Sequence, residues 1–332
     1  MGKNLFLGLL VITGVTISLL FSIDVLAQAP KPISIKALTP FPINAISNQP
    51  FPLFLDTIKK RSQGRLIIDW RGGPEIIKDV DQPEALKKGA IDMIIWTSFG
   101  YLKSHVSCAE AEGLSELSAW KERESGAFNL WSEILKKNLN AKYLGKPWSL
   151  SPFAIYSKKP IHKIEDFKGL KIRVMPLYIS FIKALGAAPV TLPMTELYTA
   201  LERGVVDGFM FIDYGITSFG LHEVVKYKIY PPVFQQETAT LINMDVWNKI
   251  PKDLQELVTD AFIDFEYIST AFLLELKNNE WQVCEKAGMS IINLPSEEAK
   301  KFRKIAYDAT WEVVIKDSPD YGPKLRELLI KK

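Results

Sequence analysis

Arg173 is the residue of this sequence best suited to holding a small anion, and it is the single arginine of residues 169–174, which predict a short strand. A guanidinium offers a planar fork of N–H donors that matches a carboxylate in bidentate fashion, and it stays charged at any working pH. An ordinary solvated arginine is the alternative, because most arginines are exposed. The residue type alone therefore permits an anion site without requiring one.

Residues for catalysis are sparse in this chain. The three histidines are His105, His162 and His222, and His222-Glu223 is followed by Val-Val-Lys, which breaks the zincin spacing. No G-x-S-x-G, Walker A, G-x-G-x-x-G or C-x-x-C motif occurs. The sequence therefore predicts a protein that is not an enzyme, without a cofactor or metal, and an enzyme stays the minor hypothesis.

The N-terminus predicts export. Lys3 precedes a nearly unbroken apolar run over residues 5–21, and small residues then lead to Ala27. This pattern is typical of a signal peptide over residues 1–27, cleaved after Ala27, which predicts a periplasmic protein. An uncleaved anchor is the alternative, since the run approaches transmembrane length. The two cysteines lie far from the cleavage site, which excludes a lipoprotein anchor.

Charge and cysteine content narrow the class further. The chain of 332 residues has 41 basic and 38 acidic side chains, a net charge of +3, so nothing indicates nucleic-acid binding. A slight positive bias favours anionic solutes only weakly. Cys108 and Cys284 could pair in an oxidising compartment, but two buried thiols are the commoner use of isolated cysteines.

Strand and helix signals alternate along the chain, which predicts an α/β fold with parallel pairing. Residues 251–286 carry apolar side chains spaced by three and four, which predicts one amphipathic helix far longer than average. A coiled coil is disfavoured there by the phenylalanines and the missing charge pairs. The other predicted elements are strands at 33–38, 65–70, 91–96, 153–157 and 189–192 and helices at 51–62 and 83–88.

Residues 166–210 resemble the solute-binding proteins of tripartite ATP-independent periplasmic (TRAP) transporters. The resemblance rests on G-L-K-I-R-V at 169–174 and on E-L-Y-T-A-L-E-R-G-V-V-D-G at 196–208, in that order of elements. It extends over nearly all of the mature chain. It implies a two-lobed periplasmic-binding-protein fold, type II-like, with a long helix spanning both lobes and the ligand in the cleft between them. The implied lobe I takes 31–150 and 239–277, and lobe II takes 151–238 and 278–332.

The resemblance also implies site residues. The family arginine at the position of Arg173 clamps a substrate carboxylate. Thr97, Ser98 and Tyr101 follow a strand at positions that touch the ligand in the family, although an ordinary loop is the alternative. Phe211 stands where the family often has a polar or indole group, and a core aromatic is the alternative there.

Two departures from the family pattern bear on the ligand. Phe153 stands where many members carry a second arginine. Residues 230–235 resemble the Y-P-G-W-W-E segment of keto-acid binders, but Gln235 replaces a glutamate that holds a metal in some of them, and a neutral amide attracts a cation less. With Phe99, Trp148 and Phe234 expected near the same cleft, one guanidinium among aromatics favours an acid with one carboxylate and an apolar or aromatic body. The alternative is that these aromatics belong to the core.

The predicted function is therefore that of a periplasmic receptor that captures a small organic acid and delivers it to a TRAP membrane permease. The alternatives are a receptor that signals to a sensor kinase and a receptor of an ABC importer. The sequence leaves open whether the protein forms a homodimer.

Overall fold

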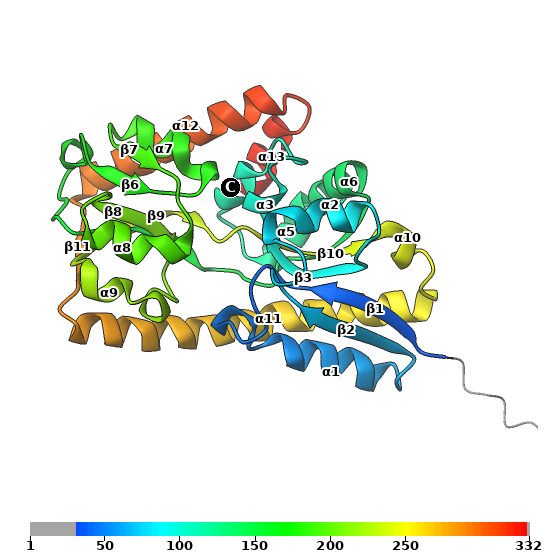
Figure 1. The fold of residues 1–332 in the computed structure, drawn as a ribbon. Coiled ribbons are helices and arrows are strands. Elements are labelled where there is room, and N and C mark those ends of the chain that lie inside the picture. The colour runs from blue at the N-terminus through cyan, green and yellow to red at the C-terminus, as the bar shows by residue number, and fades with distance from the viewer. Residues whose placement is uncertain (1–30, 331–332) are drawn as a thin grey trace, which may run out of the picture.

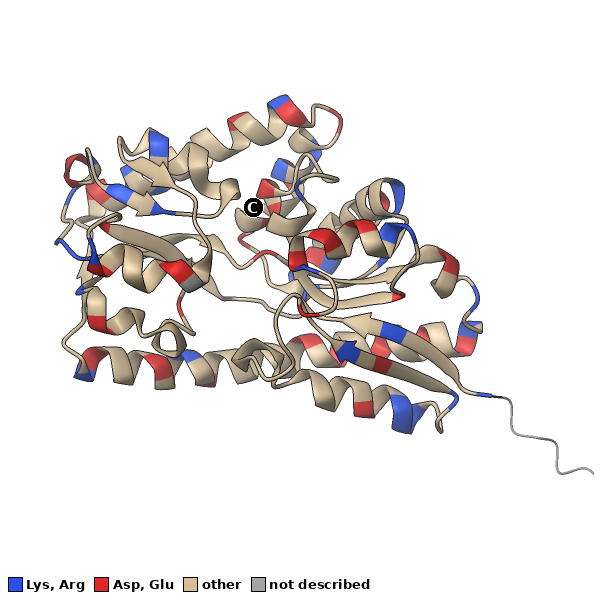
Figure 2. Ribbon diagram, in the orientation of Figure 1, with Lys and Arg blue, Asp and Glu red and all other residues tan. Residues whose placement is uncertain are grey.

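A computed structural model describes residues 31–330 and divides them into two lobes, each built on one β-sheet (Figure 1). The predicted signal peptide at 1–27 lies outside these residues. Lys, Arg, Asp and Glu alternate along most surface helices, as Figure 2 shows, in keeping with the small net charge. Within residues 31–330 no helix is both long and apolar enough to cross a lipid bilayer.

The first sheet has the strand order β2-β1-β3-β10-β4. β1 pairs in parallel with β2 and β3, whereas β10 runs antiparallel to both β3 and β4. The strands are β1 (Ile33–Leu38), β2 (Leu66–Gly72), β3 (Met93–Ser98), β4 (Ala141–Gly145) and β10 (Thr238–Asn243).

The second sheet has the order β11-β9-β5-β8-β6-β7. β6 pairs in parallel with β7 and β8, β11 pairs in parallel with β9, and β5 runs antiparallel to β8 and β9. The strands are β5 (Pro152–Ser157), β6 (Lys171–Arg173), β7 (Ala188–Val190), β8 (Gly208–Ile212), β9 (Tyr227–Gln235) and β11 (Ser290–Asn293).

Parallel pairing was predicted throughout, and β5 and β10 are the exceptions. The chain passes from β4 to β5 through residues 146–151 and returns from β9 to β10 through residues 236–237, and we call these two links the hinge segments. A strand that enters its sheet from the other lobe starts at the edge where the other strands end, so it must run antiparallel to them. The carboxyl ends of all other strands therefore face the opposite lobe, which is where open α/β sheets bind ligands.

Helices cover both faces of each sheet (Figure 1). In the first lobe α1 packs on β2, while α2 and α6 pack on the other strands; in the second lobe α12 packs on α7 and β9. The helices are α1 (Phe51–Arg61), α2 (Gln82–Lys87), α3 (Phe99–Leu102), α4 (Glu110–Gly113), α5 (Ala119–Ser125), α6 (Ala127–Leu139), α7 (Ile179–Ala184), α8 (Leu197–Glu202), α9 (Leu221–Val224), α10 (Met244–Trp247), α11 (Lys252–Lys286), α12 (Ser296–Asp317) and α13 (Gly322–Leu329).

The predicted long helix is confirmed: α11 has 35 residues and runs beneath both lobes (Figure 1). Its first half buries apolar side chains in the first lobe, where the Phe262 ring lies 5.4 Å from that of Phe54. Its second half reaches the second lobe, where Lys277 forms an ion pair with Asp213 at 3.1 Å. The helix therefore joins the lobes independently of the two hinge segments.

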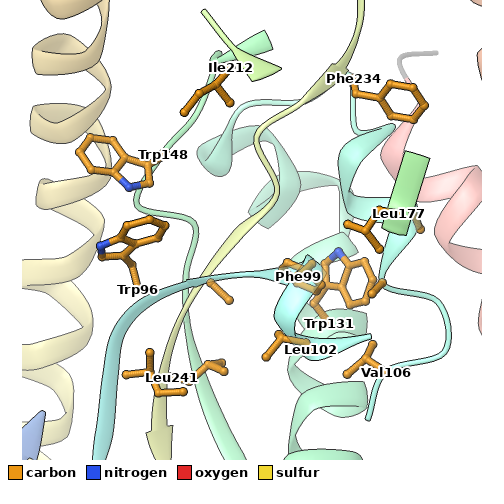
Figure 3. Close-up of a cluster of buried hydrophobic side chains, with 14 of the residues drawn as sticks. Trp96, Phe99, Leu102, Val106, Trp131, Trp148, Leu177, Ile212, Phe234 and Leu241 are labelled. Carbon is orange, nitrogen blue, oxygen red and sulfur yellow. The ribbon is translucent and has the colours of Figure 1, made fainter. Parts of the chain in front are cut away.

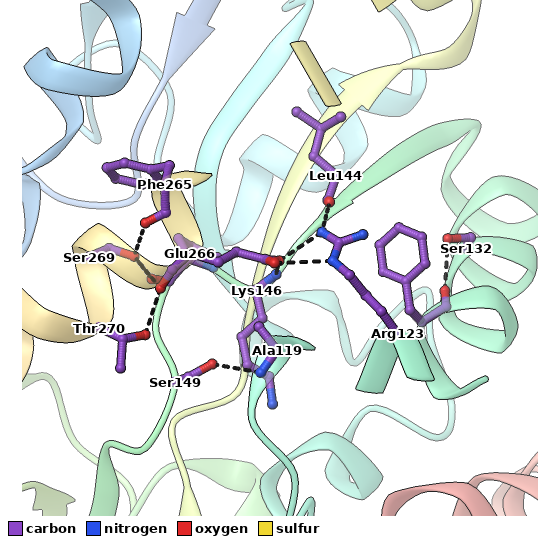
Figure 4. Close-up of polar contacts among 12 residues, drawn as sticks. Ala119, Arg123, Ser132, Leu144, Lys146, Ser149, Phe265, Glu266, Ser269 and Thr270 are labelled. Atoms are coloured by element: carbon purple, nitrogen blue, oxygen red, sulfur yellow. Dashed lines mark hydrogen bonds and ion pairs between the residues drawn. The ribbon is translucent and has the colours of Figure 1, made fainter. Parts of the chain in front are cut away.

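A buried charge network anchors the start of the first hinge segment. Lys146 is 2% exposed, and its ammonium lies 2.5 Å from Glu112 and 2.6 Å from Glu122. Its backbone N–H donates to Glu266, which in turn pairs with Arg123 at 2.8 Å (Figure 4). Burial, followed by the charge of Glu122, raises the pKa of Glu112 to about 8. The hinge segment thus leaves the first lobe at a buried residue that is held by two ion pairs and a backbone hydrogen bond.

The C-terminal helices contact both lobes. α12 packs on α7 and β9, whereas α13 packs on α4, α5 and α6 of the first lobe. We propose that lobe I consists of residues 31–150 and 239–277 and that lobe II consists of residues 151–238 and 278–332. In this division α13 belongs to lobe II by sequence but packs on helices of lobe I. Cys108 and Cys284 are both buried free thiols in different core clusters.

Candidate ligand-binding site

Arg173 lies at the carboxyl end of β6, within electrostatic reach of Tyr101 in the first lobe. The residue is only 8% exposed, and its Nε and Nη2 both donate to the Leu192 carbonyl at 3.2 Å. Burial lowers the pKa of Arg173, and the only charge effect on it comes from Tyr101. Among residues 31–330 no carboxylate lies within ion-pair distance of this guanidinium.

The Leu192 carbonyl occupies one edge of the guanidinium and leaves the other edge without a partner among the described residues. A buried cation without an anion is costly, because desolvation is not offset by a Coulomb attraction. A bidentate carboxylate on the open edge would supply the missing charge and hydrogen bonds. The predicted role of Arg173 is thus chemically consistent with its surroundings.

Strand pairing puts Phe211 on the same sheet face as Arg173. Arg173 lies opposite Phe209 on β8, and Phe211 is two residues further along that strand, so the alternation returns it to the same face. The Phe211 side chain is half-buried and packs edge-on against Phe219 at 6.4 Å. It is therefore placed to form an apolar wall near the cleft end of the sheet.

Phe153 and Phe234 lie on the opposite face. Phe153 pairs with Phe234 and with Ile212, one residue beyond Phe211, and its ring is 5.1 Å from that of Tyr178. Phe234 is fully buried, 4.7 Å from the same tyrosine. Both side chains are packed as core residues. A contact between the ligand and Phe153 or Phe234 stays a prediction.

Two further aromatics expected at the cleft are also part of the core. Phe99 is fully buried against Trp131, 4.7 Å between ring centroids (Figure 3). Trp148 is 1% exposed and packs on Phe51 at 5.7 Å. Phe99 and Trp148 are therefore packed as core residues, as the alternative interpretation of the sequence expected.

The junction of β3 and α3, residues 97–101, reaches the second lobe. Thr97 is fully buried, and its hydroxyl has no hydrogen-bond partner among the described residues. Ser98 caps α3 by accepting from the Gly100 N–H at 2.9 Å. A Cβ built on Gly100 would lie 2.7 Å from the Met175 side chain, so this turn is pressed against the second lobe. The lobes therefore meet at this junction of β3 and α3.

Tyr101 of the first lobe lies close enough to Arg173 of the second lobe to interact with it electrostatically. Burial and then the nearby Asp79 carboxylate raise the pKa of Tyr101, while the Arg173 guanidinium lowers it. The phenol thus lies within electrostatic reach of an acid in its own lobe and of the arginine in the other lobe. Sequence reasoning missed Asp79, because it lies in a polar loop far from any recognised motif.

Glu237 is a second residue that sequence reasoning missed. It lies in the return hinge segment and is 1% exposed. Its two carboxylate oxygens accept from the Ser98 hydroxyl and the Tyr178 hydroxyl, each at 2.8 Å. Burial raises the pKa of Glu237 to about 7, while these hydrogen bonds lower it. One carboxyl group thus connects the two lobes at the hinge.

Gln235 faces away from Arg173. It pairs with Pro152 and borders a cavity of about 800 Å³ that Arg173 does not line. Its side-chain oxygen is buried without a hydrogen-bond partner in the part of the chain described. Within that part no three His, Cys, Asp or Glu side chains gather in a way that could hold a metal ion.

Known proteins share both the sequence pattern and the fold. The chain is 22% identical over 276 residues to the monocarboxylate 2-oxoacid-binding periplasmic protein of Nostoc sp., covering 79% of this chain and 75% of that protein. It is 25% identical over 310 residues to the C4-dicarboxylate-binding periplasmic protein DctP of Rhodobacter capsulatus, covering 90% and 88%. A TRAP periplasmic solute-binding protein from Desulfovibrio salexigens, solved with bound orotic acid, superimposes with a TM-score of 0.78 at 22% identity, covering 89% and 97%.

These similarities agree with the observed architecture of two sheets, two hinge segments and one spanning helix. The family is one of solute-binding proteins for transport rather than of enzymes. The sequence pattern of bacterial extracellular solute-binding protein family 7, DctP, matches residues 44–317, and the chain therefore belongs to this TRAP-transporter family.

Proposed function

We propose that this protein is the periplasmic receptor of a TRAP transporter and that it captures an organic acid with one carboxylate and an apolar or aromatic body. The observation that carries this proposal is the buried Arg173 guanidinium with one edge open and no carboxylate partner among the described residues. In a closed cleft the low dielectric would strengthen its contact with a ligand carboxylate. The captured acid would then pass to the membrane permease.

The preference for one carboxylate rests on the groups around Arg173. Tyr101 approaches it from the first lobe, and Phe211 shares its sheet face. Phe153 stands where the family resemblance implies a second arginine in many members, so this position offers no second cation, and the hinge between the lobes carries the buried acid Glu237. Burying an unpaired charge costs several kcal/mol, so dicarboxylates should be rejected.

The relatives support both this class and its rival. The Nostoc protein is named for monocarboxylate 2-oxoacids and the Desulfovibrio structure holds orotic acid, whereas the Rhodobacter protein is named for C4 dicarboxylates. A panel of purified acids decides between them by thermal shift followed by calorimetry. We expect stabilisation by 2-oxo monocarboxylates or aromatic monocarboxylates. Stabilisation only by succinate, malate or a sugar acid would overturn the monocarboxylate proposal while leaving the family unchanged.

Export and the partner can be tested separately. We expect the N-terminal sequence of protein isolated from the periplasm to begin at Gln28, after cleavage at Ala27. Neighbouring genes for two membrane subunits of unequal size would support the TRAP permease, and a neighbouring ATPase gene would support an ABC importer. Retention of the unprocessed chain in the membrane fraction would contradict the signal-peptide proposal.

A further inference from the structure

A cavity of about 800 Å³ lies beside the hinge segments, apart from Arg173. Its walls come from the loop after α4, the end of β9, α11, α12 and α13, so both lobes and the spanning helix contribute. This volume is within the range of small-molecule sites. The residues that line it have no role in the carboxylate site described above, apart from the predicted Gln235.

Much of the cavity lining is apolar. Leu150 and Tyr230 are 43% and 47% exposed, although both are large hydrophobic residues. Leu150 lies in the first hinge segment with a left-handed φ of 60°, a conformation that costs a non-glycine residue free energy. Exposed apolar area gathered in one concavity is typical of a binding site. The apolar lining residues are Leu114, Leu150, Pro152, Tyr230, Pro232 and Val233.

The charged residues that line the cavity are four cations, Lys277, Arg303, Lys304 and Arg326, and two acids, Glu116 and Asp308. Lys277 is engaged by Asp213 at 3.1 Å, and Lys304 by Asp308. By contrast, Arg303 on α12 and Arg326 on α13 make no ion pair or hydrogen bond with another residue of the 31–330 range. Two guanidiniums beside an apolar lining therefore remain available for an anion.

We propose that this cavity binds a second ligand, a small amphipathic organic anion whose carboxylate, sulfonate or phosphate head meets Arg303 and Arg326. Its apolar body would cover Leu150 and Tyr230. Guanidiniums hold such heads by charge-assisted hydrogen bonds, and the apolar lining supplies burial of apolar surface. Because both lobes line the cavity, a ligand that binds the closed arrangement more tightly than the open one would favour closure of the main cleft, and the reverse would hold too.

Anilinonaphthalene sulfonate, a fluorescent amphipathic anion, is a suitable probe for titration of the folded mature protein. We expect one saturable site that is weakened about tenfold or more in R303A/R326A. The matched control is K300A/K324A, which removes one exposed positive charge from each of the same two helices outside the cavity, and we expect it to stay within about twofold of wild type. R303Q/R326Q removes the charge but keeps the aliphatic part and a polar end if the alanine variant is destabilised, and circular dichroism checks the fold.

Arg173→Ala separates this site from the carboxylate cleft. We expect this variant to bind the probe like wild type, because Arg173 does not line the cavity. Equal weakening in R303A/R326A and K300A/K324A would reduce the effect to net charge and overturn the proposal. Loss of probe binding in Arg173→Ala would also overturn it, by assigning the probe to the main cleft, without affecting the proposed transport function.

Discussion

Arg173 and Glu237 are buried charged residues of opposite sign near the contact between the lobes. Arg173 has an open guanidinium edge, whereas Glu237 has both carboxylate oxygens occupied by Ser98 and Tyr178. The first is therefore suited to contact a ligand. The second is suited to fix the relation between the lobes.

Arg173→Ala should abolish detectable ligand binding while the protein stays folded. The expected loss is about 2–5 kcal/mol, because the ligand carboxylate would be buried without a partner. Arg173→Lys should also bind poorly, since a point charge cannot reproduce the planar fork. Calorimetry measures the affinities, with Arg203→Ala, an exposed arginine of the same lobe, as the control. Binding by Arg173→Ala within threefold of wild type would show that the site lies elsewhere.

Glu237 should make the protein less stable as the pH rises from about 5 to 8. Its pKa is about 7 in the folded state against an ordinary value of 4.5, so the folded state holds the proton more tightly. The resulting stabilisation is complete below the ordinary pKa and is lost as the pH rises through the folded pKa. Glu237→Gln resembles the protonated form, and should be more stable than wild type at pH 8 by about 1–3 kcal/mol.

Urea unfolding at pH 5 and pH 8 measures this difference. Other buried acids contribute to the wild-type slope, since burial also raises the pKa of Glu112 to about 8 and that of Glu266 to about 7. The informative quantity is therefore the change of slope between wild type and Glu237→Gln. Glu275→Gln, at an exposed position on α11, should keep the wild-type slope. Identical slopes in Glu237→Gln and wild type would count against the buried, proton-linked role.

At the scale of elements, α11 is the part of the fold that both lobes share. Its apolar residues pack into the first lobe, and its second half is tied to the second lobe by Lys277 with Asp213 and by Glu280, which accepts from Thr217 at 2.8 Å and 2.9 Å. The two hinge segments can therefore change conformation while the helix keeps the lobes attached.

Phe262→Ala should destabilise the protein by about 3–5 kcal/mol, because it leaves a cavity between α11 and α1. The Phe262 ring is fully buried, and lies 5.4 Å from that of Phe54 and 6.1 Å from that of Phe265. Leu274→Ala, at a position 44% exposed on the same helix, should cost less than about 1 kcal/mol. Denaturant unfolding compares the two, and similar losses would refute the view that this interface is part of the core.

At the scale of the whole molecule, the lobes are in contact through the junction of β3 and α3 and through Glu237. Gly100 abuts Met175, and Ser98 and Tyr178 meet on the same carboxyl group. Two lobes joined by a few crossing segments move as rigid bodies, and a ligand that touches both stabilises the closed arrangement.

Ligand binding should therefore compact the molecule. Small-angle scattering with a saturating acid should give a smaller radius of gyration than without it. The same acid should leave the curve of Arg173→Ala unchanged, which distinguishes closure from a general effect of the solute. An identical curve for wild type with and without ligand would argue against a cleft that closes on its ligand.

The sequence by itself determined the local elements and the family. The three-and-four spacing of apolar residues over 251–286 is a local signal, and α11 spans Lys252–Lys286. The motif around Arg173 likewise sits within one stretch of chain, so it indicated both the fold and the candidate carboxylate ligand before any contact was known.

Only the tertiary structure decided which residues meet between the lobes. Ser98 and Glu237 are 139 residues apart and Tyr178 and Glu237 are 59 apart, and no local pattern specifies such pairs. The antiparallel direction of β5 and β10 follows from the crossing of the chain between lobes, which strand composition does not encode. The same holds for Phe153 and Phe234, because the face that a strand residue occupies depends on register, and register is set by pairing with distant strands.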